Sequence, residues 1–272
     1  MRLTPGTPLS VGLAFDRGAP PLPAARLAMD AGLAQLEWSE AVIERRLAVA
    51  ALYYPPEPGL QAARGRVFDG LHGFLTDSLP EGWGYLLMRK RLAKLGVDIA
   101  TLTPLERLAL VGDQGRGALV FEPATTPRED IATLDLDALA EDATALLTGE
   151  EGRLADTLAG LAGGSGGARP KVHVGFDGRG NVSVGEGEIA PGHTAWLVKF
   201  RAPEDPIDIG PIEEAYAAMA TAGTAGGRRP RRAPRRGGGG QLRSATVWGA
   251  LGAAVRHGDA QMPGAGLRAA AL

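Results

Sequence analysis

Apolar and polar residues alternate with two different periods along the first half of the chain. Runs with a period of two, set between Pro- and Gly-rich turns, predict β-strands; these runs are 11–15, 33–38 and 115–121. Runs with the period of an α-helix predict two helices; these are 85–95, after a turn at 77–84, and 104–110. The second helix is expected to begin after Thr103, with Pro104 in its first turn. Residues 41–51 fit both periods imperfectly, so they stay open between strand and helix.

The second half of the chain predicts a helix-rich segment followed by a small sheet. An acidic amphipathic helix is expected at 136–147 and a shorter one at 154–161. Strands are expected at 171–176, 181–184 and 194–200. The first two are joined through Asp177-Gly178, a dipeptide typical of hairpin turns. A last helix is expected at 213–222, and the periodicity stops after Gly223.

These elements predict an α+β fold in four parts. Residues 1–125 form a small β-sheet with helices, and residues 126–149 form a linker with the acidic helix. Residues 150–223 form an antiparallel sheet with one helix. Residues 224–272 form a basic tail rich in Arg, Gly, Pro and Ala, which is expected to be disordered.

The length, composition and charge of the chain limit the classes of protein to which it can belong. The chain has 272 residues, enough for one large or two modest cores, and it contains no cysteine, which excludes disulfides and thiolate metal sites. No basic-then-apolar leader and no apolar run near the length of a membrane span is present, so a soluble, cytoplasmic protein without a membrane partner is expected. The net charge of -2 conceals an acidic body and a basic tail, in which Asp259 is the sole acid.

A glycine-rich loop and two lysines carry the candidate chemistry. The loop Gly164-Ser165-Gly166-Gly167-Ala168-Arg169-Pro170 leads into Lys171 at the start of a strand, and Lys199 ends a later apolar strand. Glycines let backbone amides approach phosphate oxygens, and a lysine on such a strand can hold a phosphate as a point charge. Taken singly, a glycine loop is more often a linker and a strand-end lysine more often solvated, so the combination matters.

Three patches, in this order, resemble HipA-type serine/threonine kinases, the toxins of bacterial type II toxin–antitoxin pairs. The first patch is Phe74-Leu75-Thr76-Asp77-Ser78-Leu79-Pro80-Glu81-Gly82-Trp83-Gly84, followed by segments 108–113 and 115–119. The second is Ser165–Lys171, and the third is His193–Lys199 with Glu213-Glu214 downstream. The resemblance covers roughly residues 5–225 and implies a HipA-type N-terminal subdomain followed by a kinase-like N-lobe.

The resemblance also implies a nucleotide site and a partner. The implied cofactors are ATP and Mg²⁺, and the implied nucleotide-binding residues are Ser165, Gly166, Gly167, Ala168, Lys171, Lys199 and Glu214. Within that set, Lys199 would hold the phosphates and Glu214 would orient it. The implied partner is a HipB-like helix-turn-helix antitoxin, through which any DNA contact would be indirect, and the protein substrate stays unidentified.

The kinase pattern is not completed after Lys199. Phosphoryl transfer needs a catalytic aspartate and magnesium ligands, and no such motif is recognisable, so no catalytic residue or metal ligand is predicted. His257-Gly258-Asp259 is similar to a kinase catalytic loop, but Gly264 stands where an asparagine is expected. The expectation is a HipA-like toxin that is truncated after the N-lobe and therefore catalytically inactive. Because the family consists of kinases, the question whether this chain is an enzyme stays open.

Two alternatives to a kinase remain at this point. One is a non-enzymatic HipA-like module that binds an antitoxin, and the other is a non-functional gene remnant. The Arg- and Pro-rich run at 228–236 has the composition that a frameshift produces in GC-rich DNA, and a nucleic-acid-binding arm is the competing interpretation of the tail.

Overall fold

The computed structural model describes residues 3–4, 6–15, 19–50, 52–115, 117–126, 136–150, 152–162, 167–177, 182–183, 192–213, 215–216, 219 and 243–244. The chain divides into two compact units. The N-terminal unit comprises Met1–Glu129 with Gly163–Gly166, and the C-terminal unit comprises Asp130–Ala162 with Gly167–Leu272. The acidic helix predicted at 136–147 is thereby part of the C-terminal unit.

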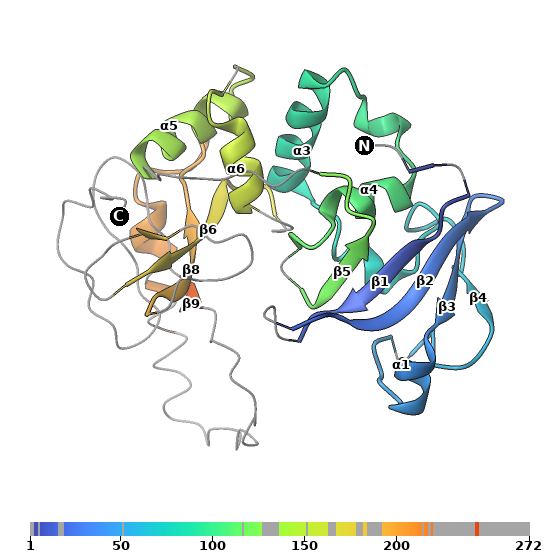
Figure 1. The fold of residues 1–272 in the computed structure, drawn as a ribbon. Helices are drawn as coiled ribbons and strands as arrows, with labels where there is room; N and C mark the ends of the chain where they lie inside the picture. The colour runs from blue at the N-terminus through green and yellow to red at the C-terminus, as the bar shows by residue number, and fades with distance from the viewer. Residues whose placement is uncertain are drawn as a thin grey trace. The chain divides into compact units, whose positions relative to one another are not determined.

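The N-terminal unit contains a five-stranded antiparallel sheet (Figure 1). Its strands are β1 (Leu9–Leu13), β2 (Leu22–Asp30), β3 (Leu33–Trp38), β4 (Leu60–Ala62) and β5 (Leu119–Glu122), in the order β4-β3-β2-β1-β5. The prediction of a strand at 33–38 is confirmed, and those at 11–15 and 115–121 are confirmed with shifted ends. No strand was predicted at 22–30, where Pro23 and the alanines weaken the alternation.

One face of this sheet is buried because the pairing register aligns the apolar positions of neighbouring strands. Val11 lies opposite Ala25 on β2 and opposite Phe121 on β5, and Leu27 lies opposite Leu36. All five side chains belong to the same core. The other face carries the exposed residues Ser10, Arg26, Glu37 and Glu122. A shift of one residue in any strand would exchange the two faces, so the pattern fixes the register.

The helices of this unit are α1 (Glu40–Glu44), α2 (Gly73–Thr76), α3 (Gly82–Lys94), the 3₁₀ turn η1 (Ile99–Thr101) and α4 (Pro104–Val111). Helices α1, α2 and α4 contribute buried residues to the core of the sheet, whereas Leu92 of α3 and Ile99 of η1 pack with Leu110 of α4 in a second, smaller core. Thr103 caps α4 by accepting from the backbone N–H of Glu106, whose carboxylate accepts from the Thr103 N–H at 2.8 Å. The predicted start of this helix is confirmed. Leu108 and Ala109 of α4 are fully buried in the same core as the sheet.

A buried histidine connects β4 with α2. The His72 side chain is fully buried, and its Nε2–H donates to the Gln61 carbonyl oxygen at 2.9 Å. The imidazole also meets the Tyr54 ring edge-on, with 4.5 Å between the ring centroids. Burial lowers the pKa of His72 below its ordinary value, and the bond to Gln61 opposes this change more weakly. The folded state therefore favours the neutral imidazole.

This preference predicts a loss of stability in mild acid. At pH above 6.5 His72 is neutral in both states, and its contribution is fully present. As the pH falls from 6.5 toward the lowered folded-state pKa, His72 becomes protonated in the unfolded chain but stays neutral in the folded protein. The free energy of unfolding therefore decreases. Urea titrations between about pH 5 and 7.5 should show a shallower decline for His72→Gln, which keeps an N–H donor for Gln61 but does not titrate. Parallel pH profiles for the two proteins would contradict the prediction.

The described part of the C-terminal unit combines helices with a four-stranded sheet (Figure 1). Its elements are α5 (Leu136–Leu147), α6 (Ala155–Ala162), β6 (Lys171–Phe176), β7 (Val182–Ser183), β8 (Thr194–Lys199) and β9 (Arg243–Ser244). The sheet order is β7-β6-β8-β9, with β6 antiparallel to β7 and β8, and β9 parallel to β8. The predicted helices and hairpin strands of this segment are confirmed, whereas β9 was not predicted.

One face of this second sheet is also apolar and buried. Val172 and Val174 of β6 lie opposite Val198 and Trp196 of β8, and all four are buried. Helix α6 contacts β6 and packs against α5. The turn before α6 is held by the buried Asp142, whose carboxylate accepts from the backbone N–H groups of Arg153 and Leu154 at 2.9 and 2.8 Å.

The helix predicted at 213–222 begins earlier, since residues 209–213 are already helical. Most of the tail after residue 223 lies outside the described residues, so the predictions made for it remain predictions. Among the described residues, no helix has both the length and the apolar character needed to cross a bilayer.

Candidate functional site

The predicted site residues are only partly within the described structure. Gly167, Ala168, Lys171 and Lys199 are described, whereas Ser165, Gly166 and Glu214 lie outside the described residues. The described members come from the loop before β6, from the first residue of β6 and from the last residue of β8. They therefore meet at one end of the β6–β8 strand pair.

The pairing register brings the two lysines together. Lys171 and Lys199 lie directly opposite each other across β6 and β8. Residues opposite each other in an antiparallel pair project to the same face, with Cβ atoms about 5 Å apart. We call this face, opposite to the buried valines, the lysine face; His173 and Leu197 lie on it as the neighbouring cross-strand pair. Like charges in such positions repel, so the arrangement needs an anionic group.

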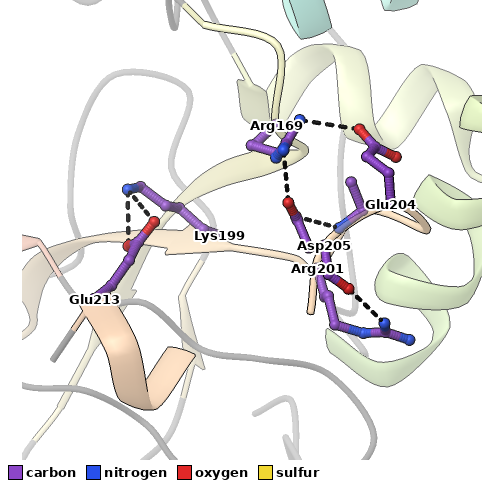
Figure 2. A network of polar contacts seen from close by, with 7 residues as sticks. Arg169, Lys199, Arg201, Glu204, Asp205 and Glu213 are labelled. Carbon is purple, nitrogen blue, oxygen red and sulfur yellow. Dashed lines mark hydrogen bonds and ion pairs between the residues drawn. The ribbon is translucent and has the colours of Figure 1, made fainter. Parts of the chain in front are cut away.

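Glu213 supplies one anionic group. Its Oε2 lies 3.0 Å and its Oε1 3.3 Å from the Nζ of Lys199, and Figure 2 shows both contacts. The carboxylate comes from the helical turn 209–213, and both side chains are about one third exposed (31% for Lys199 and 35% for Glu213). Solvent therefore screens this ion pair in part, and its value lies more in orienting Lys199 than in stabilising the fold.

Lys171 is more deeply placed than Lys199. The residue is 8% exposed, which is unusual for a lysine. Burial lowers the pKa of the Lys171 ammonium, the positive charge of Lys199 lowers it further, and the Glu213 carboxylate acts in the opposite direction. An additional anion near the two lysines would relieve the same electrostatic cost.

Gly167 lies beside the Lys171 ammonium. Its φ of +86° belongs to the left-handed region, and a Cβ at this position would lie 2.9 Å from the Lys171 Nζ. A side chain at 167 would therefore be strained and would displace the ammonium. The backbone conformation therefore favours glycine at 167, and the contact with the flexible lysine adds a smaller constraint.

The arrangement is suited to binding an anion with several oxygens. Lys171 and Lys199 lie opposite each other at the end of a glycine loop, and Glu213 contacts Lys199. Phosphate groups are the usual ligands of sites that combine lysines with such a loop. Within the described ranges, no group of three His, Asp or Glu side chains is placed to hold a metal ion.

The carboxylate that contacts Lys199 was not among the predicted site residues. Glu213 lies there, whereas Glu214, which was expected beside Lys199, lies outside the described residues and stays a prediction. The expectation began the helix at Glu213, so the helical phase was not known. The turn at 206–209, where the Ile209 N–H donates to the Pro206 carbonyl, shows that the helix starts earlier. Asp208, a residue type common at helix N-caps, directly precedes the first helical residue and is the signal that could have set this phase.

The N-terminal unit contains a cavity that is mainly apolar. It has a volume of about 780 Å³ and is lined by Tyr53, Tyr54, Arg64, Val67, Phe68 and Phe74, among other residues. The Arg64 guanidinium stacks over the Tyr53 ring at 4.6 Å from its centroid. Val67 is 88% exposed, so the cavity opens among apolar side chains that solvent reaches.

Comparison with known proteins identifies the first of the two units. No curated protein and no solved structure matches the chain. Residues 21–122 match the family model described as HipA N-terminal domain. The matched range runs from the start of β2 to the end of β5 and so includes four strands of the first sheet. The chain therefore carries a HipA N-terminal domain, which suggests a HipA-related toxin–antitoxin context.

Proposed function

We propose that the C-terminal unit is a kinase-type nucleotide-binding lobe of a HipA-related protein. In this proposal the lysine face receives the phosphates of ATP, with Lys199 as the phosphate-binding lysine and Glu213 as the carboxylate that orients it. The observation that carries the proposal is the 3.0 Å contact between Lys199 and Glu213 at the end of a strand that pairs with the strand of Lys171. Kinase sites hold phosphates with such a lysine–glutamate pair.

The glycine loop supports the same assignment. Gly167 adopts a backbone conformation that favours glycine, and it lies beside Lys171, the first residue of β6. In the proposal, backbone N–H groups of Gly167 and Ala168 donate to phosphate oxygens, while Lys171 and Lys199 neutralise their charge. Ser165 and Gly166 lie outside the described residues and stay predictions. The proposal assigns no step to Mg²⁺.

The proposal is one of binding rather than of phosphoryl transfer. Transfer requires a base for the acceptor hydroxyl and carboxylates for the metal, in addition to a phosphate-binding lysine. The second candidate is a module that binds a HipB-like helix-turn-helix antitoxin. The HipA N-terminal domain at residues 21–122 and the apolar cavity of the same unit favour it. The two candidates are compatible, since they use different units.

Calorimetry with Mg·ATP tests the nucleotide proposal. Wild-type protein should bind, and Lys199→Ala should weaken binding on the order of a hundredfold, because it removes a charged donor to the phosphates. Lys94→Ala removes an exposed lysine of α3 and is the matched control, with unchanged affinity. A folded wild type that gives no heat and no displacement of a fluorescent ATP analogue would overturn the proposal. The antitoxin-binding module would then stand alone, to be tested by co-purification.

A further inference from the structure

A second set of charged residues lies next to the lysine face and was not part of the predicted site. Arg169, in the last part of the glycine loop, contacts two carboxylates at once (Figure 2). Its Nη1 donates to Glu204 Oε1 at 2.9 Å, and its Nη2 donates to Asp205 Oδ1 at 2.6 Å. We call Arg169, Glu204 and Asp205 the loop clamp.

Asp205 is the fixed member of the loop clamp. Its side chain is 3% exposed, and its second oxygen, Oδ2, accepts from the backbone N–H of Ala202 at 2.9 Å. The Arg201 guanidinium donates to the Asp205 backbone oxygen at 3.1 Å. Because the turn is closed by its own hydrogen bonds, Asp205 has little freedom to follow Arg169. The arginine and its loop are thus held against a stationary carboxylate.

A backbone hydrogen bond connects the same two segments as the loop clamp. The Phe200 N–H donates to the Pro170 carbonyl at 2.8 Å, directly after the paired lysines. The loop clamp thus joins two segments that are far apart in the sequence. One carries Gly167 and Lys171, and the other continues from Lys199 through the turn 201–206 to the helical turn of Glu213.

We propose that Arg169 is a positioning residue for phosphate binding: through Asp205 and Glu204 it fixes Gly167 and Lys171 relative to Lys199 and Glu213. This inference rests on the proposed function, because it assigns a role at the same site. Arg169 does not need to touch the nucleotide. Its guanidinium has the planar, forked donors that two separate carboxylate oxygens require, which a lysine ammonium does not reproduce.

A loop clamp that only stabilises the fold and one that positions the phosphate-binding residues differ in which ligand affinities they change. If the loop clamp only stabilises the unit, its loss weakens all ligands alike through the folded fraction. If it positions the loop, its loss weakens ligands that have phosphates and spares those that lack them. The comparison of ATP with adenosine therefore separates the two roles, because adenosine has no group for the loop or the lysines to bind.

The test measures both ligands by displacement of a fluorescent ATP analogue, with Arg169→Met, Arg169→Lys, Glu204→Gln and the control Arg153→Met. Arg153 is an exposed arginine of the same unit outside the loop clamp. Arg169→Met should raise the Kd for Mg·ATP about tenfold and leave that for adenosine unchanged, as expected for a displaced binding group. Arg169→Lys should recover part of the loss. Glu204 is 62% exposed, so Glu204→Gln should fold normally and weaken ATP binding about twofold.

The outcomes separate the loop clamp from the proposed function. If wild type binds Mg·ATP and Arg169→Met binds it equally well, the loop clamp has no positioning role while the nucleotide site stands. An equal loss for ATP and adenosine also overturns the positioning role. If Arg169→Met does not fold, Glu204→Gln provides the test. A loss of affinity for Mg·ATP without a loss for adenosine supports the positioning role, and equal changes for both ligands overturn it. A wild type that binds neither ligand overturns both the loop clamp and the nucleotide proposal.

Discussion

Replacing Phe121 by alanine should destabilise the N-terminal unit by about 3–5 kcal/mol, the usual cost of deleting a fully buried aromatic ring. Phe121 on β5 has no exposed surface and lies opposite Val11, in the core that also holds Leu108 and Ala109 of α4. Its ring therefore fills the space between sheet and helix. Domains of this size have total stabilities of about 5–15 kcal/mol, so the loss is a large fraction of the whole.

Amide hydrogen exchange followed by mass spectrometry is the suitable measurement, because it resolves β1, β2 and α4 separately. Protection in all three elements should fall together for Phe121→Ala. Phe15→Ala is the matched control, since the Phe15 side chain is 73% exposed, and it should change protection by less than about 0.5 kcal/mol. Equal effects of the two substitutions would contradict the assignment of Phe121 to the core.

Gly70→Ala should have the second large effect, about 3 kcal/mol, from two causes that add. The φ of Gly70 is +79°, which strains any residue with a Cβ, and that Cβ would overlap the Gly32 carbonyl oxygen. The overlap involves backbone on both sides, so no side chain can move to relieve it. The Ala34 N–H also donates to the Gly70 carbonyl at 2.8 Å, so a displaced turn would lose a bond to β3.

A second glycine separates the two causes. Gly96 has a similar φ of +70°, and a Cβ there would meet no atom within 4 Å. Gly96→Ala should therefore cost only the backbone strain, about 1 kcal/mol. Urea denaturation of both variants gives the comparison. If Gly70→Ala costs no more than Gly96→Ala, the contact between residues 70 and 32 does not constrain the turn.

The sequence pattern located the secondary structure well where local signals were strong. Thr103, Pro104 and Glu106 mark the start of α4, and these residues form the capping box that the structure contains. The alternation at 33–38 and 171–176 gave both strands with their observed ends. In contrast, β2 carries Pro23 and small residues, and its strand character comes from pairing with β1 and β3 rather than from local preference.

The candidate site could be predicted only as far as it follows from residue type. Lys171 and Lys199 stand out as cations at the ends of apolar strands, but their direct opposition depends on the register of β6 and β8, which the sequence does not state. The contact between Lys199 and Glu213 depends in addition on where a helix begins. Arg169 and Asp205 meet across a long sequence separation, and no local pattern announces such a pair.

The opposed lysines also bear on how faithfully the second sheet assembles. In the observed register both ammonium groups stand on the lysine face, away from Val172, Val174, Trp196 and Val198. If β8 slipped by one residue against β6, its side chains would exchange faces, and the Lys199 charge would enter the apolar side at a prohibitive cost. The two lysines repel each other in the correct register, but they also disfavour the register that is shifted by one residue. A substitution such as Lys199→Leu would remove this selection between the two registers.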